Sequence, residues 1–159
     1  MKTLLCSFVL LLLIGCRSEE DMRKMMREEI SKAAARSYFT SAQVVGPYTP
    51  AITTGGLVFI SGQIGISQET GQFVGEDVES QTRQALANVL ALARQAGCDS
   101  SDIVQCTVFL KNMNNFQKMN LIYGGYFAEG KYPTRSTVEV SNLPKNAEIE
   151  ISAIAVRPH

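Results

Sequence analysis

Hydrophobic and polar positions recur with two different periods along the chain, and the period predicts the type of each element. Runs of β-branched and alternating apolar residues predict strands at residues 38–43, 51–54, 57–66, 103–110, 136–140 and 148–156. The second and third runs meet at Gly55-Gly56, which predicts a hairpin or a bulged bend. Apolar residues at helical spacing predict one helix that begins after Asp77 as its N-cap and closes at Gly97, and a second from about residue 114 to residue 129.

These elements predict how the sheet and the helices are layered. The run at residues 103–110 carries apolar side chains toward both faces, so we expect it to be a central strand. The second helix carries aromatic side chains along one side, and this pattern favours a core face over a platform for stacking nucleic-acid bases. The sequence therefore predicts a single α+β domain, a mixed β-sheet with two helices packed on one face.

The first 16 residues have the pattern of a lipoprotein-type signal peptide. They read MKTLLCSFVLLLLIGC, with one lysine, an apolar run and a small residue before Cys16, and Leu13-Ile14-Gly15-Cys16 resembles the bacterial lipobox, whose cysteine is lipidated. Residues 1–16 are predicted to be the signal, residues 17–35 a charged tether with some helical tendency, and residues 36–159 the domain. We expect a membrane-anchored lipoprotein on the periplasmic or cell-surface side. Methionines at positions 22, 25 and 26 leave open an internal start and a cytoplasmic product.

Composition narrows the function classes. Lysine and arginine number 15, aspartate and glutamate number 15, and this balance offers no basic surface for nucleic acid. The four cysteines match neither a metal site nor a disulfide framework in their spacing, and the one histidine, His159, is the last residue. Histidine-based acid-base chemistry and metal chemistry are therefore not expected.

A few polar residues beside strands remain as candidates for chemistry. Arg135 precedes a strand and has the planar fork that binds a carboxylate in a bidentate manner, but a solvated charge at the rim of the domain fits the pattern equally well. Glu150 alternates to the same face as Ser152, and this face is either solvated or the wall of a cleft in which burial would raise the pKa of the carboxyl group. Cys106 and Cys98 are expected to be inert structural residues.

Several short stretches, taken together and in order, resemble the RidA family, also called YjgF, whose members are reactive intermediate deaminases. The stretches that carry the resemblance span about 120 residues of the chain after the tether. They are Gly46-Pro47-Tyr48, Phe59-Ile60-Ser61-Gly62-Gln63, Gln81 with Asn88, Ala96-Gly97, Thr107-Val108-Phe109-Leu110, Asn120 with Tyr123, Pro133-Thr134-Arg135-Ser136, and Leu143-Pro144 with Glu148-Ile149-Glu150.

The resemblance implies a fold like that of bacterial chorismate mutase and a homotrimer with a ligand cleft at each subunit interface. It implies that Arg135 binds the substrate carboxylate and that Glu150 positions and activates a water. Tyr48 would line the cleft, Asn120 would support it, and the backbone at Ser61 and Gly62 would orient the ligand. The implied reaction is hydrolysis of an enamine or imine acid, such as 2-aminoacrylate, to a 2-keto acid and ammonia, without a metal or organic cofactor.

The chain departs from the family pattern at three places. Pro50 stands where the family usually has glutamine, so the loop beside Tyr48 and the substrate range are expected to differ. Thr137 stands where many deaminases have cysteine, at a position that varies among active relatives. The signal with Cys16 is the third departure, because most members are cytosolic. Two other functions stay open at this point, a non-enzymatic binding protein for small carboxylates and an endoribonuclease or translation inhibitor, which the neutral charge does not favour.

Overall fold

The computed structural model describes residues 18–158, so the predicted signal peptide with Cys16 lies outside the described residues, as does His159. The chain divides at the boundary between Ala35 and Arg36 into two compact units, which are described one at a time.

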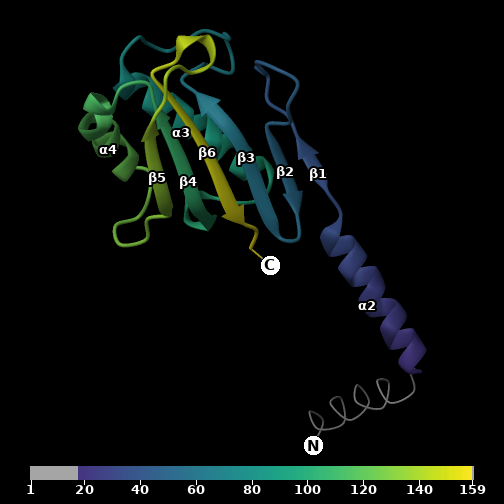
Figure 1. The fold of residues 1–159 in the computed structure, drawn as a ribbon. Helices are drawn as coiled ribbons and strands as arrows, with labels where there is room; N and C mark the ends of the chain where they lie inside the picture. The colour runs from purple at the N-terminus through teal and green to yellow at the C-terminus, as the bar shows by residue number, and fades with distance from the viewer. Residues whose placement is uncertain (1–17, 159) are drawn as a thin grey trace, which may run out of the picture. The chain divides into compact units, whose positions relative to one another are not determined.

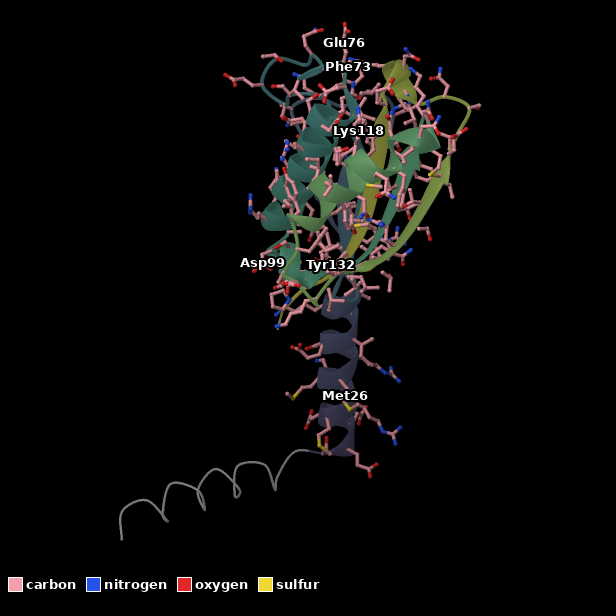
Figure 2. The ribbon with its side chains drawn as sticks, turned by 90° about the vertical axis from the view of Figure 1, so that its left-hand side faces the viewer. Met26, Phe73, Glu76, Asp99, Lys118 and Tyr132 are labelled. Carbon is pink, nitrogen blue, oxygen red and sulfur yellow. The ribbon has the colours of Figure 1, made fainter. Side chains whose placement is uncertain are left out.

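Helix α2 (Glu19–Ala34) makes up most of the described part of the first unit and agrees with the helical tendency expected of the tether. Ser18 begins it as an N-cap: its hydroxyl accepts the Asp21 N–H at 3.1 Å, and the Asp21 carboxylate accepts the Ser18 N–H at 3.3 Å. Its large apolar side chains Met22, Met25, Met26 and Ile30 are exposed, and Met26 is labelled in Figure 2. Over the part of the chain that the structure describes, no helix is both long enough and apolar enough to cross a membrane.

The second unit contains one mixed six-stranded sheet with the strand order β1-β2-β3-β6-β4-β5 (Figure 1). All neighbouring strands are antiparallel except β4 and β5, which run parallel. Strand β4 lies between β6 and β5, so the prediction of a central strand is confirmed. The strands are β1 (Ser37–Phe39), β2 (Ala51–Thr54), β3 (Leu57–Ile64), β4 (Ile103–Leu110), β5 (Thr134–Glu139) and β6 (Ile149–Val156).

Three strands differ from the prediction by two or more residues at one end. Strand β1 ends at Phe39, and the chain from there to β2 is a loop. Strand β3 ends at Ile64, and only an isolated bridge from Ile66 to Phe73 continues the pairing. The sequence pattern placed Arg135 before the strand. Strand β5 begins at Thr134, however, so Arg135 lies inside it. The hairpin at Gly55-Gly56 is confirmed, with φ angles of 58° and 78° that favour glycine.

Helices α3 (Val78–Gln95) and α4 (Phe116–Gly124) pack on one face of the sheet, and Figure 1 shows α3 running behind the central strands. Asp77 caps α3 as predicted, because its carboxylate accepts the Ser80 N–H at 2.7 Å. Helix α4 is shorter than predicted. It ends at two consecutive glycines, Gly124 and Gly125, which weaken helix propensity at that point. Short 3₁₀ turns complete the fold at Ser100–Asp102, Met113–Asn115 and Pro144–Asn146.

The main hydrophobic core fills the space between the two helices and the sheet. The side chains of Leu86, Val89, Val108 and Ile151 are at most 1% exposed. The aromatic side of α4 belongs to this core, as predicted: Tyr123 is buried, and Phe116 packs against the core from a partly buried position. Cys106 and Cys98 are also buried there, in agreement with the structural role expected of them. Among the described residues of the second unit, 36–158, no helix packs on the opposite face of the sheet, which is called the uncovered face below.

Candidate functional site

The strand register decides which side chains share a face of the sheet. Arg135 pairs with Cys106, and Cys106 pairs with Ala153, so these three side chains point to the face covered by the helices. Glu150 pairs with Phe109 and lies three positions from Ala153 along β6, an odd spacing that turns it to the uncovered face. Arg135 and Glu150 of one chain therefore point away from each other.

The distance between these two residues follows from the spacing of the sheet. Their strands are separated by β4, and their register positions differ by three residues. A strand spacing near 4.8 Å and a rise near 3.3 Å per residue place their Cα atoms about 14 Å apart, before the divergence of the side chains is counted. A ligand of five or six non-hydrogen atoms does not span that distance through the sheet.

A β-bulge in β3 forms the wall beside Glu150. The register with β6 shifts between Ile60 and Gln63, so that Ser61 and Gly62 leave the regular ladder. The Gln63 side-chain amide secures the bulge by donating to the carbonyl oxygens of Ser61 at 3.1 Å and of Gly62 at 3.2 Å. Gly62 lies directly against the Glu150 carboxylate, and a Cβ atom at this position would overlap it. Glycine is therefore needed here to seat the carboxylate.

The uncovered face carries a cavity of about 390 Å³ at this bulge. The turn before β2 forms one side of it, where the Tyr48 N–H donates to the Gly46 carbonyl at 2.9 Å across Pro47. Its walls are mostly apolar, and Glu150 is the one acidic group among them. The lining residues are Val45, Gly46, Tyr48, Ser61, Gly62, Ile64, Pro144 and Glu150.

Burial raises the pKa of the Glu150 carboxyl group, which is the direction expected of a group that exchanges protons near neutral pH. Of the two environments that the sequence left open for Glu150, the structure has the cleft and not the solvated face. Lys111, which follows β4, forms an ion pair with Glu148, with its Nζ 3.0 Å from the Glu148 Oε1. None of the residues lining the cavity is a cation, so one copy of the chain offers no counter-charge there for an anionic ligand.

Arg135 is held on the other face by helix α4. Its Nη2 donates to the Asn120 Oδ1 at 2.8 Å, and its guanidinium carbon lies 4.4 Å from the centre of the Tyr123 ring and 5.7 Å from that of Phe116. Within residues 18–158, no carboxylate forms an ion pair with it. This half-buried guanidinium is neither a freely solvated charge nor, among residues 18–158, a neutralised one.

Tyr123 and Phe116, which sequence reasoning assigned only to the core, also contact the Arg135 guanidinium. Tyr123 is 3% exposed, and its hydroxyl has no hydrogen-bond partner among the described residues. Burial, with the Cys106 thiol beside it, raises the pKa of Tyr123, and burial raises the pKa of Cys106 as well. The spacing from Asn120 to Tyr123 on one helix was the only signal in the sequence, and it does not reveal that the ring lies against the guanidinium.

The predicted site residues thus fall into two groups. Tyr48, Ser61, Gly62 and Glu150 line the cavity on the uncovered face. Arg135 and Asn120 contact each other on the face with the helices and do not line it. The described residues hold no group of three or more histidine, cysteine, aspartate or glutamate side chains that could bind a metal ion.

The second unit is thus a small α+β domain with two helices on one face of a mixed sheet and a glutamate in an apolar cavity on the other. The chain belongs to the family described as endoribonuclease L-PSP, whose model matches residues 39–157. The resemblance to RidA proteins that its motifs indicated is thereby confirmed. A RutC family protein of Pyrococcus horikoshii is 50% identical over 113 residues, which cover 71% of this chain and 89% of that protein. A 2-iminobutanoate/2-iminopropanoate deaminase of Escherichia coli is 45% identical over 115 residues, which cover 71% of this chain and 89% of that enzyme.

Solved structures agree with the fold. Escherichia coli TdcF with bound serine is 41% identical, has a TM-score of 0.71, and is matched over 76% of this chain and 98% of that chain. A putative endoribonuclease of Thermotoga maritima is 40% identical, has a TM-score of 0.73, and is matched over 79% of this chain and 99% of that chain. Because these proteins match almost over their full length, the domain from residue 36 onward corresponds to a complete folding unit.

Proposed function

We propose that the protein is a hydrolytic deaminase of enamine and imine acids such as 2-aminoacrylate, which it converts to 2-oxo acids and ammonia. The observation that carries the proposal is the pair of complementary groups: a glutamate with a raised pKa in an apolar cavity, and a half-buried arginine that lacks a carboxylate partner. Relatives 45% to 47% identical are named 2-iminobutanoate/2-iminopropanoate deaminase.

The two groups act together only when two copies of the chain meet. Since Arg135 and Glu150 lie on opposite faces of one sheet, the active site takes Glu150 from one copy and Arg135 from its neighbour. The uncovered face supplies a surface for this assembly, because it carries exposed apolar side chains, among them Leu57, Phe59, Val138 and Val156. A closed ring of three copies, the homotrimer expected of the family, gives every site both residues.

In this site the Arg135 guanidinium binds the substrate carboxylate, held in its orientation by Asn120 and the two aromatic rings. An enamine first gains a proton at C3 and loses one from its nitrogen, which gives the imine. Glu150 takes a proton from a water as its oxygen bonds to C2, and the imine nitrogen gains a proton to give a carbinolamine. The C2–N bond then breaks, ammonia leaves, and the hydroxyl loses its proton to give the 2-oxo acid. Water and imine are consumed, and no oxidant or reductant is needed.

The test uses the domain of residues 36–159 with 2-aminoacrylate generated enzymatically in the assay, and it follows release of pyruvate. The wild-type domain is expected to accelerate release over the uncatalysed rate, and Arg135→Ala is expected to abolish the acceleration. A wild-type domain without acceleration ends the enzyme proposal. In that case, a higher thermal midpoint with 2-oxo acids would identify a binding protein for small carboxylates.

We further propose that the chain is a lipoprotein anchored through Cys16. The sequence pattern supports this proposal, and so does the start of the family match at residue 39, which leaves the signal and the tether outside the conserved domain. Helix α2, with 16 residues, would act as a spacer about 24 Å long between anchor and domain. Metabolic labelling with a radioactive fatty acid tests the anchor: label is expected on the wild type and not on Cys16→Ser. An unlabelled wild type indicates instead a product that starts at an internal methionine and stays in the cytoplasm.

A further inference from the structure

Two hydrogen bonds to the neighbouring loop fix the direction of the Ser61 hydroxyl. Its Oγ donates to the Thr49 carbonyl at 2.7 Å, and its backbone N–H donates to the Pro50 carbonyl at 2.9 Å. A serine hydroxyl has one proton and two lone pairs, so the bond to Thr49 uses the only proton. What Ser61 presents to the cavity is therefore an acceptor.

Pro50 makes this arrangement rigid. A residue that precedes proline is restricted to extended backbone, so Thr49 has little freedom to turn its carbonyl away from Ser61. Pro50 itself is buried and has a fixed φ. The substitution of proline for the usual family residue at this position thus has a physical consequence, which is a loop that holds the acceptor carbonyl in place.

We propose that Ser61 is a specificity-determining residue whose Oγ accepts a hydrogen bond from the N–H of an imine and discriminates against the C=O of the 2-oxo acid. The proposal rests on the deaminase function given above. Substrate and product differ at one position, where the imine carries N–H and the product carries an oxygen with lone pairs only. The Ser61 Oγ, which has no proton to donate, attracts the N–H of the imine and repels the oxygen of the 2-oxo acid. Ser61 also precedes Gly62, against which the Glu150 carboxylate lies.

This discrimination favours turnover as well as binding. The N–H donor is strongest when the imine nitrogen is protonated, which is the form that water attacks most readily at C2. After ammonia leaves, the same Ser61 oxygen faces the carbonyl oxygen of the product and no longer stabilises the bound ligand. We therefore expect the 2-oxo acid to bind more weakly than the imine, although both carry the carboxylate that Arg135 holds.

The kinetic test compares Ser61→Ala with the wild type for two quantities, the KM for 2-iminopropanoate and the inhibition constant of pyruvate. We expect the KM to rise about 10-fold to 100-fold, as for loss of a hydrogen bond from a charged donor, while the inhibition constant stays equal or falls. Ser61→Thr keeps the hydroxyl and is expected to keep the difference. Ser41→Ala is the matched control, because the Ser41 hydroxyl also donates to a loop carbonyl, that of Gln43 at 3.3 Å, but lies outside the cavity.

Two results would overturn the proposal. In the first, Ser61→Ala raises both the KM for 2-iminopropanoate and the inhibition constant of pyruvate, which would mean that Ser61 donates to the ligand. In the second, neither constant changes. A second arm does not need turnover. It measures the thermal midpoint of wild type and Ser61→Ala with equal concentrations of L-alanine, which has N–H donors, and pyruvate, which has none. A larger wild-type shift with alanine, lost in Ser61→Ala, supports the role of Ser61 even if the wild type proves inactive, and a difference that survives the substitution contradicts it.

Discussion

The contact between Gly62 and Glu150 gives the sharpest single-residue prediction about the active site. A Cβ atom added at Gly62 would lie 2.5 Å from Cδ and 2.9 Å from Cγ of Glu150, whereas ordinary contact begins at 3.4 Å. In Gly62→Ala the carboxyl carbon must therefore retreat by about 0.9 Å, the difference between 3.4 and 2.5 Å. Misplacement of a catalytic group by about 1 Å lowers a rate on the order of 100-fold, so we expect a loss in kcat of that size.

The same substitution should leave the fold nearly as stable as before. The atoms that meet the new Cβ belong to a flexible side chain that can swing toward the cavity, and Gly62 does not have a positive φ. Gly65→Ala is the matched control in the same strand region. There the new Cβ would lie 2.6 Å from the Cα of Gln81, and a helix backbone cannot move so easily. We expect Gly65→Ala to lower the free energy of unfolding by about 1–3 kcal/mol, as overpacking does.

The assay measures pyruvate release and thermal unfolding on the same preparations of wild type, Gly62→Ala and Gly65→Ala. The expected pattern is a slow enzyme with an unchanged midpoint for Gly62→Ala and a lowered midpoint for Gly65→Ala. A Gly62→Ala variant with the wild-type kcat would refute the reasoning, because Glu150 would then not need the position that the glycine provides. Equal losses of stability in the two variants would also refute it.

Other predictions concern the buried groups around the two halves of the site. Burial raises the pKa of Glu150 above its ordinary value of 4.5, so the folded domain binds this proton more tightly than the unfolded chain does. The free energy of unfolding therefore falls as pH rises from the ordinary pKa through the raised pKa. Glu150→Gln should therefore gain stability over wild type across that range, and unfolding in denaturant at pH 4 to pH 8 checks whether the difference grows with pH. Tyr123→Phe should be about as stable as wild type, because only the Cys106 thiol, a weak hydrogen-bonding group, lies beside the buried hydroxyl. Tyr123→Leu should raise the KM, because Arg135 loses the ring that holds it, and thermal melts and kinetics on both variants test these two expectations. Leu86→Ala, at a side chain that is 1% exposed, should lower the free energy of unfolding by about 2–5 kcal/mol in the same melts.

Local patterns were sufficient to predict most of the elements of the second unit. The alternation in residues 103–110 predicted both the strand β4 and its central place, and Asp77 predicted the start of α3. Such signals are local, since a cap or a period involves residues a few positions apart. The end of α4 was missed because aromatic residues beyond Gly124 continued the helical spacing, and they reach the core from a turn.

The geometry of the site could not be predicted from spacing. Alternation along β6 puts Glu150 on one face of the sheet. The face of Arg135 depends on its pairing with Cys106 of β4, a strand that lies far from Arg135 in the sequence. The bulge at Ser61 and Gly62 could not be predicted from the sequence either, because it arises from a shift in the pairing register with β6. Motifs were sufficient to name individual site residues. Their division between the two faces of the sheet could be established only from the strand pairing in the structure.

That division leads to the measurement that tests the account most directly. Arg135→Ala and Glu150→Gln domains, each inactive as a homotrimer, are co-expressed in equal amounts with different tags, and mixed trimers are purified through both tags in turn. If each active site takes Arg135 from one copy and Glu150 from the next, a ring of three copies that contains both variants has both residues in one of its three sites, and pyruvate release should return to about a third of the wild-type rate. Mixed trimers as inactive as the two parents would contradict a shared site, because they would show that both residues must come from the same copy.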